Sequence, residues 1–269
     1  MIRCEGLVHV YPDGTRAVDG VDLEIKAGER VAIVGQNGSG KSTLVRHFNG
    51  LLRPTAGAVF VDGRPAAGRR VADLASIVGL VFQDPDRQIF AGRVRTEVAF
   101  GARNVGLRGA ALERAIADAL AAVGLADVAA ANPYDLGYSR RKLLALASIL
   151  AMGTPVVVLD EPTTGQDARG GQRIRGVVAN LSAAGRTVIA ISHDMRFVAE
   201  SFERVVVMGG GRIVLDGRPD EVFDAPSWPA LASTNLEPPL AAVVGSQLDL
   251  GSTPTQAALV AALEAAQAG

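Results

Sequence analysis

Residues 35–43, which read Gly-Gln-Asn-Gly-Ser-Gly-Lys-Ser-Thr, constrain the fold of this chain more than any other stretch. Residues 31–34 precede them as an apolar run typical of a buried strand, and residues 44–48 have the pattern of a helix. A strand, a turn of the form G-x-x-x-x-G-K-S and a helix together indicate a phosphate-binding P-loop. Its glycines let backbone N–H groups converge on an anion at the helix N-terminus. The alternative is a glycine-rich turn that binds nothing.

Two side chains of this loop have expected roles of their own. Lys41 is expected to reach the β- and γ-phosphates of a nucleotide, and the Ser42 hydroxyl to hold Mg²⁺. Tyr11 lies just before the turn Pro12-Asp13-Gly14, and its place upstream of a P-loop favours a stacking platform for adenine over simple packing. The remaining predicted nucleotide contacts are Asn37, Gly38, Ser39, Gly40 and Thr43.

The composition limits the class of protein. With 269 residues, 48% hydrophobic and 20% charged, the chain is long for one compact domain and has a globular composition. A formal net charge of −1 gives no basic excess for nucleic-acid binding. Cys4 is the only cysteine, which fits a reducing cytosol. The start carries no signal peptide, and the longest apolar stretch, 143–152, is far shorter than the ~20 residues of a membrane span. We therefore expect a soluble chain that reaches a membrane only through a partner.

The periodicity of the chain indicates an α/β fold with an insertion. Residues 6–10 and 18–25 have the pattern of antiparallel strands, and 77–82 of a buried strand that ends at Gln83. A glutamine there is usually a solvated end residue, but beside a P-loop its amide oxygen could bind Mg²⁺ or orient a water. Between about 84 and 152 the apolar spacing becomes helical, with a helix stop at Gly124 and a helix cap at Ser139, which predicts an inserted helical subdomain.

Acidic residues follow the next apolar run, 156–159. Carboxyl ends of strands in α/β sheets face the ligand, so Asp160 is expected to bind Mg²⁺ through its water shell and Glu161 to act as general base for an attacking water. The alternative is that the two acidic residues have no catalytic role and only begin a helix, where acidic side chains are favoured. The strand 187–192 ends at His193, which is predicted to contact the γ-phosphate although a lone histidine is usually packing or surface.

The order of these motifs resembles the ATPase cassette of ABC transporters over roughly residues 2 to 223. Within that family, residues 82–90 and 217–223 look like the energy-coupling factor (ECF) importers of vitamins and of cobalt or nickel ions. The resemblance implies a P-loop NTPase (RecA-like) core in a cassette at 1–217, with an antiparallel β subdomain and the inserted helical subdomain. It also implies a helical extension at 218–269 that helps two subunits dimerise, with its last helix capped by Thr253 and Pro254.

The same resemblance implies cofactors, partners and a location. ATP and Mg²⁺ would bind between two ATPase subunits, expected to be identical and arranged head to tail. A transmembrane coupling subunit and a substrate-binding membrane subunit would complete the importer, at the cytoplasmic face of the membrane. Cobalt and biotin are substrate guesses at the level of the family.

One motif departs from the family pattern. Where the family reads L-S-G-G-Q, this chain has Leu136-Gly137-Tyr138-Ser139-Arg140. That element normally caps the γ-phosphate held by the partner subunit, and Asp167 is predicted to belong to the same partner site. We expect Ser139 to replace the missing serine, with help from the guanidinium groups of Arg140 and Arg141. Two alternatives stay open: a nucleotide-binding regulatory module with little turnover, and a soluble ABC-type ATPase acting on nucleic acid or translation.

Overall fold

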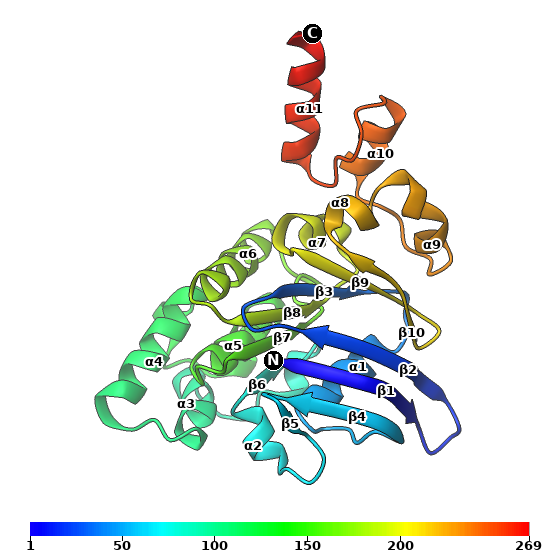
Figure 1. The fold of residues 1–269 in the computed structure, drawn as a ribbon. Helices are drawn as coiled ribbons and strands as arrows, with labels where there is room; N and C mark the ends of the chain where they lie inside the picture. Colours follow the sequence, from blue (N-terminus) through cyan, green and yellow to red (C-terminus); the bar gives the residue numbers. More distant parts are fainter. Residues whose placement is uncertain (269) are drawn as a thin grey trace.

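A computed structural model describes residues 1–268 as two β-sheets with helices around them (Figure 1). The smaller sheet is antiparallel with the order β2-β1-β4-β5. Its strands are β1 (Ile2–Val10), β2 (Arg16–Ile25), β4 (Ala56–Val61) and β5 (Arg64–Pro65). Strand β1 pairs with both β2 and β4, and its alternation of buried and exposed side chains is that of a strand with one face on a core. The predicted strands at 6–10 and 18–25 are therefore parts of longer ones.

The larger sheet has the order β10-β9-β3-β8-β7-β6. Strands β9, β3, β8, β7 and β6 run parallel, and β10 is antiparallel to β9. The strands are β3 (Arg30–Val34), β6 (Val78–Val81), β7 (Val156–Asp160), β8 (Thr187–Ile191), β9 (Arg204–Gly209) and β10 (Arg212–Gly217). Strands β7 and β8 are buried along their full length, as expected of strands covered on both faces. The parallel arrangement brings the ends of β3, β6, β7 and β8 to one edge, where the predicted site residues follow.

One hydrophobic cluster lies between the two sheets. Helix α1 (Lys41–Phe48) contributes Leu44, Val45 and Phe48 to it, and the sheets contribute side chains such as Ile33 and Val158. Because α1 is anchored on both sheets, the glycine-rich loop before it is held on a rigid base. The short helix α2 (Val71–Ala75) adds Leu74 to the same cluster.

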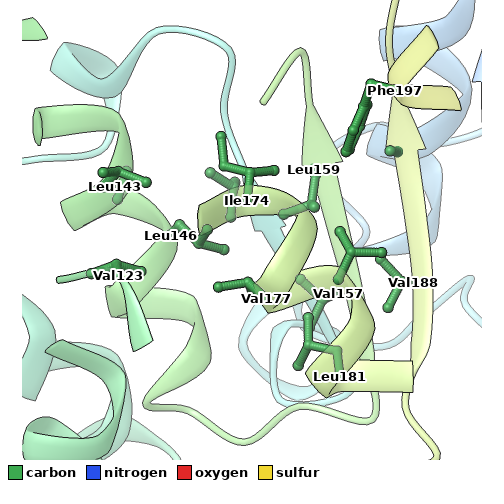
Figure 2. Packing of buried hydrophobic residues seen from close by; sticks show 14 of the residues in the cluster. Val123, Leu143, Leu146, Val157, Leu159, Ile174, Val177, Leu181, Val188 and Phe197 are labelled. Carbon is green, nitrogen blue, oxygen red and sulfur yellow. The ribbon is translucent and has the colours of Figure 1, made fainter. Parts of the chain in front are cut away.

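A second cluster covers the other face of the larger sheet. It includes helices from the stretch between β6 and β7, namely α3 (Val94–Asn104), α4 (Gly109–Ala122) and α5 (Tyr138–Leu150), together with α6 (Ala168–Ala183) and α7 (Met195–Ser201). Figure 2 shows Ile174, Val177 and Leu181 of α6 packed beside β7 and α5. Helix α4 ends before Gly124, whose φ of 66° suits a glycine after a helix end, as the sequence indicates.

Residues 218–268, after β10, form four α-helices; the first packs against β9 and β10, and the last two extend away from the sheets (Figure 1). They are α8 (Pro219–Val222), α9 (Trp228–Ala232), α10 (Leu240–Gln247) and α11 (Gln256–Ala268). The predicted start of the last helix at Thr253 is wrong, because the Thr255 hydroxyl instead accepts from the N–H of Ala258. Thr253 is buried and donates to the carbonyl of Ala241 in α10, so it joins the two helices and does not cap one.

Candidate functional site

A cavity of about 660 Å³ opens where the P-loop meets the strand ends. It brings together residues that are far apart in the sequence, from Tyr11 near the start of the chain to Leu236. Eleven predicted site residues line it: Tyr11, Asn37, Gly38, Gly40, Lys41, Ser42, Thr43, Gln83, Asp160, Glu161 and His193. Ser39 is buried in the loop beneath it, and the residues predicted for the partner's site lie elsewhere.

The loop 35–40 has a conformation that only glycine allows at two points. Gly40 has a φ of 97°, and a Cβ there would lie 2.1 Å from the carbonyl oxygen of Ala17. A Cβ on Gly35 would lie 2.3 Å from the carbonyl oxygen of Met208. The Lys41 ammonium folds back over the loop and donates to the carbonyls of Gly35, at 2.6 Å, and Gln36, at 2.9 Å. Burial lowers the pKa of Lys41, although Glu161 and Asp160 partly restore it.

The oxygen atoms at the loop suit phosphate and Mg²⁺. The Ser42 hydroxyl donates to Asp160 Oδ1 at 3.4 Å, and burial raises the pKa of that carboxyl. The Ser39 hydroxyl is buried with no hydrogen-bond partner among residues 1–268, which is unusual for a folded chain and fits a loop that encloses a polar ligand. Within the described part of the chain, no three His, Cys, Asp or Glu side chains are grouped to hold a metal ion. A hydroxyl and one carboxylate match Mg²⁺ held mainly by nucleotide phosphates and water.

Glu161 lies just past the end of β7 in a strained conformation. Its φ is 51°, a left-handed value that costs a non-glycine residue about 1–3 kcal/mol. Its carboxylate lies 2.8 Å from Nδ1 of His193 and accepts a hydrogen bond from the Thr164 hydroxyl at 3.3 Å. The side chain of Glu161 is 10% exposed and that of His193 is 64% exposed. A shielded carboxylate held by two donors at the mouth of a phosphate loop is suited to orient and deprotonate a water.

Tyr11 lies at the other end of the cavity. Its hydroxyl is 3.0 Å from the Thr43 hydroxyl, and its ring meets His9 edge-on at a centroid distance of 4.6 Å. His9 is in turn 3.2 Å from His47, which contacts the Thr43 carbonyl from α1. These contacts tie the ring of Tyr11 to the P-loop helix. Stacking of adenine on this ring stays a prediction.

The altered motif at 136–140 begins helix α5 differently from the prediction. Gly137 is the N-cap residue and Tyr138 the first helical residue, so Ser139 is not the cap that we expected. A 3₁₀ turn that begins at Pro133 and the extended backbone of Gly137 set the helix start two residues earlier. The ring of Tyr138 packs over Gly165, where a Cβ would come within 2.7 Å of it. The Ser139 hydroxyl donates to Gln166 Oε1 at 2.8 Å.

Three of the five predicted partner-site residues face a second cavity of about 440 Å³, which Gly137 and Tyr138 do not line. Ser139, Arg140 and Asp167 line it, together with Arg169 and Arg173. Asp167 caps α6 by accepting from the N–H of Gly170 at 2.7 Å. Arg140 pairs with Asp127 at 3.2 Å. Arg141 does not line this cavity and pairs with Asp86 at 3.1 Å, so only Arg140 of the two arginines expected to help Ser139 faces it.

The comparison with protein families decides the assignment. Residues 18–164 match the family model described as ABC transporter. This chain belongs to the ABC transporter family. Its relatives assign it to the ECF-type ATP-binding subunits: it is 42% identical over 225 residues to the energy-coupling factor transporter ATP-binding protein EcfA of Methanocaldococcus jannaschii, covering 83% of this chain and 81% of the relative. The ABC ATPase and P-loop core expected from the sequence are thereby confirmed.

Other relatives agree with the assignment. A putative ABC transporter ATP-binding protein of Caldanaerobacter subterraneus is 40% identical over 94% of this chain, which spans 44% of that relative's length. The structure of CbiO1 from Clostridium perfringens, part of the ABC transporter complex CbiONQ, superposes with a TM-score of 0.76 at 35% identity, covering 92% of this chain and 98% of CbiO1. A dimeric ATP-binding cassette bound to ADP and Pi superposes with a TM-score of 0.74 at 25% identity, covering 81% and 98%. Among residues 1–268, no helix is long and apolar enough to cross a bilayer.

Sequence reasoning missed several residues around the nucleotide cavity of this ABC subunit, among them Asn235, Leu236 and Lys142. Asn235 and Leu236, which follow α9, line the cavity, and the Asn235 amide donates to Gln36 Oε1 at 2.6 Å. Lys142 is buried and donates to the carbonyl of Glu161. No local motif marks Asn235, but Lys142 shares a helical face with Leu146 and Ile149, and a charge on an apolar face signals a buried partner.

Proposed function

We propose that two copies of this chain assemble head to tail and hydrolyse ATP at the cytoplasmic face of the membrane. The cycle drives an ECF-type importer that takes up a transition-metal ion such as cobalt, or a vitamin such as biotin. The observation that carries this proposal is the Glu161–His193 pair, 2.8 Å apart, beside Ser42 and Asp160 in the P-loop cavity. The names of EcfA, an energy-coupling factor transporter protein, and of CbiO1, part of an ABC transporter complex, support the transporter class.

The residues divide the chemistry between them. Ser42, Asp160 and Gln83 would hold Mg²⁺, which when bound offsets the charge of the phosphate oxygens. Glu161 takes a proton from the attacking water, and His193 keeps the Glu161 carboxylate aimed into the cavity. Lys41 leaves the carbonyls of Gly35 and Gln36 to neutralise the β- and γ-phosphates. The loop amides of 38–43 complete the phosphate cradle.

The partner copy completes the site. Ser139, at the start of α5, would donate to the γ-phosphate held by the other subunit, releasing Gln166 as it does so. Extension 218–269, with α10 and α11, would add to the contact between the copies. The dimeric cassette bound to ADP and Pi supports this arrangement at the level of the family.

A groove between the P-loop side and the helices is the proposed docking place for the transmembrane coupling subunit. It has a volume of about 340 Å³ and an apolar wall that includes Leu51, Val71, Phe90 and Phe100, whose side chains are all exposed. Phe82 lies in the groove, directly before Gln83 of the cavity, so the two sites share one strand end. Asp84, Asp86 and Arg87, which we predicted as contacts, lie in the polar turn that follows. An apolar groove with a charged edge fits an amphipathic helix of that subunit.

Reconstituted transport tests the proposal. The chain would be copurified with its membrane partners, sealed in vesicles with ATP, and assayed with labelled cobalt and labelled biotin in parallel. Uptake of one of them that needs ATP and is lost in Lys41→Ala is the expected result. ATP hydrolysis that no transport accompanies, with either substrate or with nickel, would contradict the importer assignment.

A regulatory nucleotide-binding module is the second candidate, and Tyr138 favours it. The ring over Gly165 fills space that the family pattern leaves to glycine, which would hinder closure of the partner on ATP. Phosphate release by the full complex distinguishes the two: the module would bind ATP tightly and release almost no phosphate.

A further inference from the structure

Lys142 has an unusual place for a lysine. The chain has three lysines among its 27 basic residues, and Lys41 and Lys142 are both buried. Lys142 is in the first two turns of α5, and its ammonium donates to the carbonyls of Glu161, at 2.5 Å, and Thr164, at 2.9 Å. A compact ammonium with three donors can bond both carbonyls at once. The residues that line the nucleotide cavity in the described chain do not include Lys142.

The two carbonyls belong to the turn that carries the general base. Glu161 opens this turn in its left-handed conformation, with its N–H bonded to the carbonyl of Ile191 in β8. The orientation of the next peptide is therefore fixed on one side by the sheet and on the other by Lys142. A turn that relaxed toward ordinary backbone angles would redirect the Glu161 side chain away from His193.

Charged groups surround Lys142 from several elements. Glu161 and Asp160 at the end of β7 and Asp84 after β6 favour its protonated form. Lys41 of α1 is attracted by the same two carboxylates of β7. Burial is the larger influence and lowers the pKa of Lys142 from 10.5 to about 8.

We propose that Lys142 is a positioning residue for ATP hydrolysis, which holds the 161–164 turn so that the Glu161 carboxylate points into the nucleotide cavity. The inference rests on the proposed role of Glu161. Because Lys142 and Ser139 lie on the same helix start, it also links the base in one subunit to the helix that meets the partner's nucleotide. Lys142 acts through Glu161 and not on the nucleotide, so it affects turnover and leaves binding unchanged.

The test compares Lys142→Met and Lys142→Gln with Lys26→Gln, which removes the same charge from an exposed lysine. Losing charge-assisted hydrogen bonds predicts a fall in kcat of about 10- to 100-fold for Lys142→Met, with the Kd for ATP changed less than about twofold. Lys142→Gln should recover part of the turnover, because its amide still donates to a carbonyl. Lys26→Gln should match the wild type.

The pH profile separates positioning from stability. Turnover of the wild type should fall as pH rises through about 8, where Lys142 loses its charge, and the fall should be absent in Lys142→Gln. Because the folded pKa lies below 10.5, the unfolded chain holds the proton more tightly between pH 8 and 10.5. In that window this group's contribution to the free energy of unfolding rises with pH, so the deprotonation of Lys142 does not itself unfold the protein.

Three outcomes would overturn the inference: wild-type kcat in Lys142→Met, a loss of ATP affinity as large as the loss of kcat, or the same pH profile in Lys142→Gln as in the wild type. If Lys142→Met does not fold, Lys142→Gln decides by its kcat and its pH profile. Glu161→Gln distinguishes this inference from the proposed function. Full turnover in Glu161→Gln would contradict the role of Glu161 as general base. Loss of turnover in Glu161→Gln together with full turnover in Lys142→Met would contradict only the role of Lys142.

Discussion

At the scale of single residues, Glu161 gives the sharpest prediction. Glu161→Gln keeps the shape of the side chain and its place beside His193 but cannot accept a proton. We expect ATP binding to persist and turnover to fall by about 100-fold or more, since general base catalysis contributes roughly 10²–10⁴-fold. With hydrolysis blocked, ATP should hold two copies together.

Phosphate release and light scattering with ATP measure the two effects of Glu161→Gln. Glu24→Gln, on the exposed face of β2, is the matched control and should hydrolyse ATP like the wild type. Near-normal turnover in Glu161→Gln would contradict the assignment of Glu161 as the general base.

Ser139 carries the second residue-scale prediction. Its hydroxyl is bonded to Gln166 in the single chain, at a helix start that accepts an anion. If it donates to the partner's γ-phosphate, Ser139→Ala loses one charge-assisted hydrogen bond, worth about 1.5–3 kcal/mol, and turnover drops at least about tenfold.

The comparison for Ser139→Ala is Gly137→Ser/Tyr138→Gly, which restores the family pattern, each with the membrane partner present. The double variant should hydrolyse ATP faster than the wild type, because closure no longer meets the tyrosine ring. Full activity in Ser139→Ala would show that the Ser139 hydroxyl has no role at the partner's γ-phosphate and only bonds Gln166.

The site residues that could be predicted from the sequence are those that lie close together in one loop or directly after an apolar strand. The glycines, Lys41 and Ser42 occupy fixed places in one loop, and Asp160, Glu161 and His193 each follow an apolar strand. Lys142 was not predictable, because its partners are carbonyls of a turn 19 and 22 residues away, and carbonyls leave no mark in a sequence. The cap prediction at Ser139 failed because Gly137, two residues before it, is also a favoured N-cap residue.

At the scale of elements, the groove beside Phe90 and Phe100 makes a testable docking surface. The two rings meet edge-on at 4.7 Å and are about half exposed, an apolar surface on α3 and the loop before it. Phe100→Asp should abolish copurification with the transmembrane partner and leave ATP hydrolysis by the isolated chain unchanged. Val214→Asp, on the exposed side of β10, should change neither.

Cysteines placed at 84, 86, 90 and 100 should crosslink to the same partner. Cys4 does not interfere, because burial raises the pKa of its thiol to about 12. Crosslinks that form only from residues 218–269 would place the docking surface elsewhere.

The pattern of elements followed from the sequence where one periodicity dominates. The strands β3, β7 and β8 are continuous apolar runs, and α4 repeats its apolar positions at helical spacing. The helix cap predicted at Thr253 was wrong. A threonine before a proline has the composition of a helix cap, but the Thr253 hydroxyl is buried and donates to the Ala241 carbonyl. Such a choice depends on tertiary contacts that composition does not contain.

At the scale of the whole molecule, helix α1 packs between the two sheets, and other helices cover the opposite face of the larger sheet (Figure 1). This packing holds the strand ends together at one edge of the larger sheet. Topology explains why residues so distant in sequence meet in one cavity. It also explains why Asn235 escaped prediction, since the path of the chain after β10 is set by packing. Leu231 and Thr234 are buried there, and Leu236 packs on the core.

The bond between Asn235 and Gln36 has a practical consequence for any shortened form of this protein. A version cut after Phe223 keeps every recognisable motif but removes one wall of the nucleotide cavity, whereas a version cut after Pro239 keeps it. We expect the shorter version to bind ATP about threefold more weakly than the longer one, in line with the loss of roughly one neutral hydrogen bond, by titration calorimetry. Equal affinities of the two versions would show that residues after Phe223 are not needed for ATP binding.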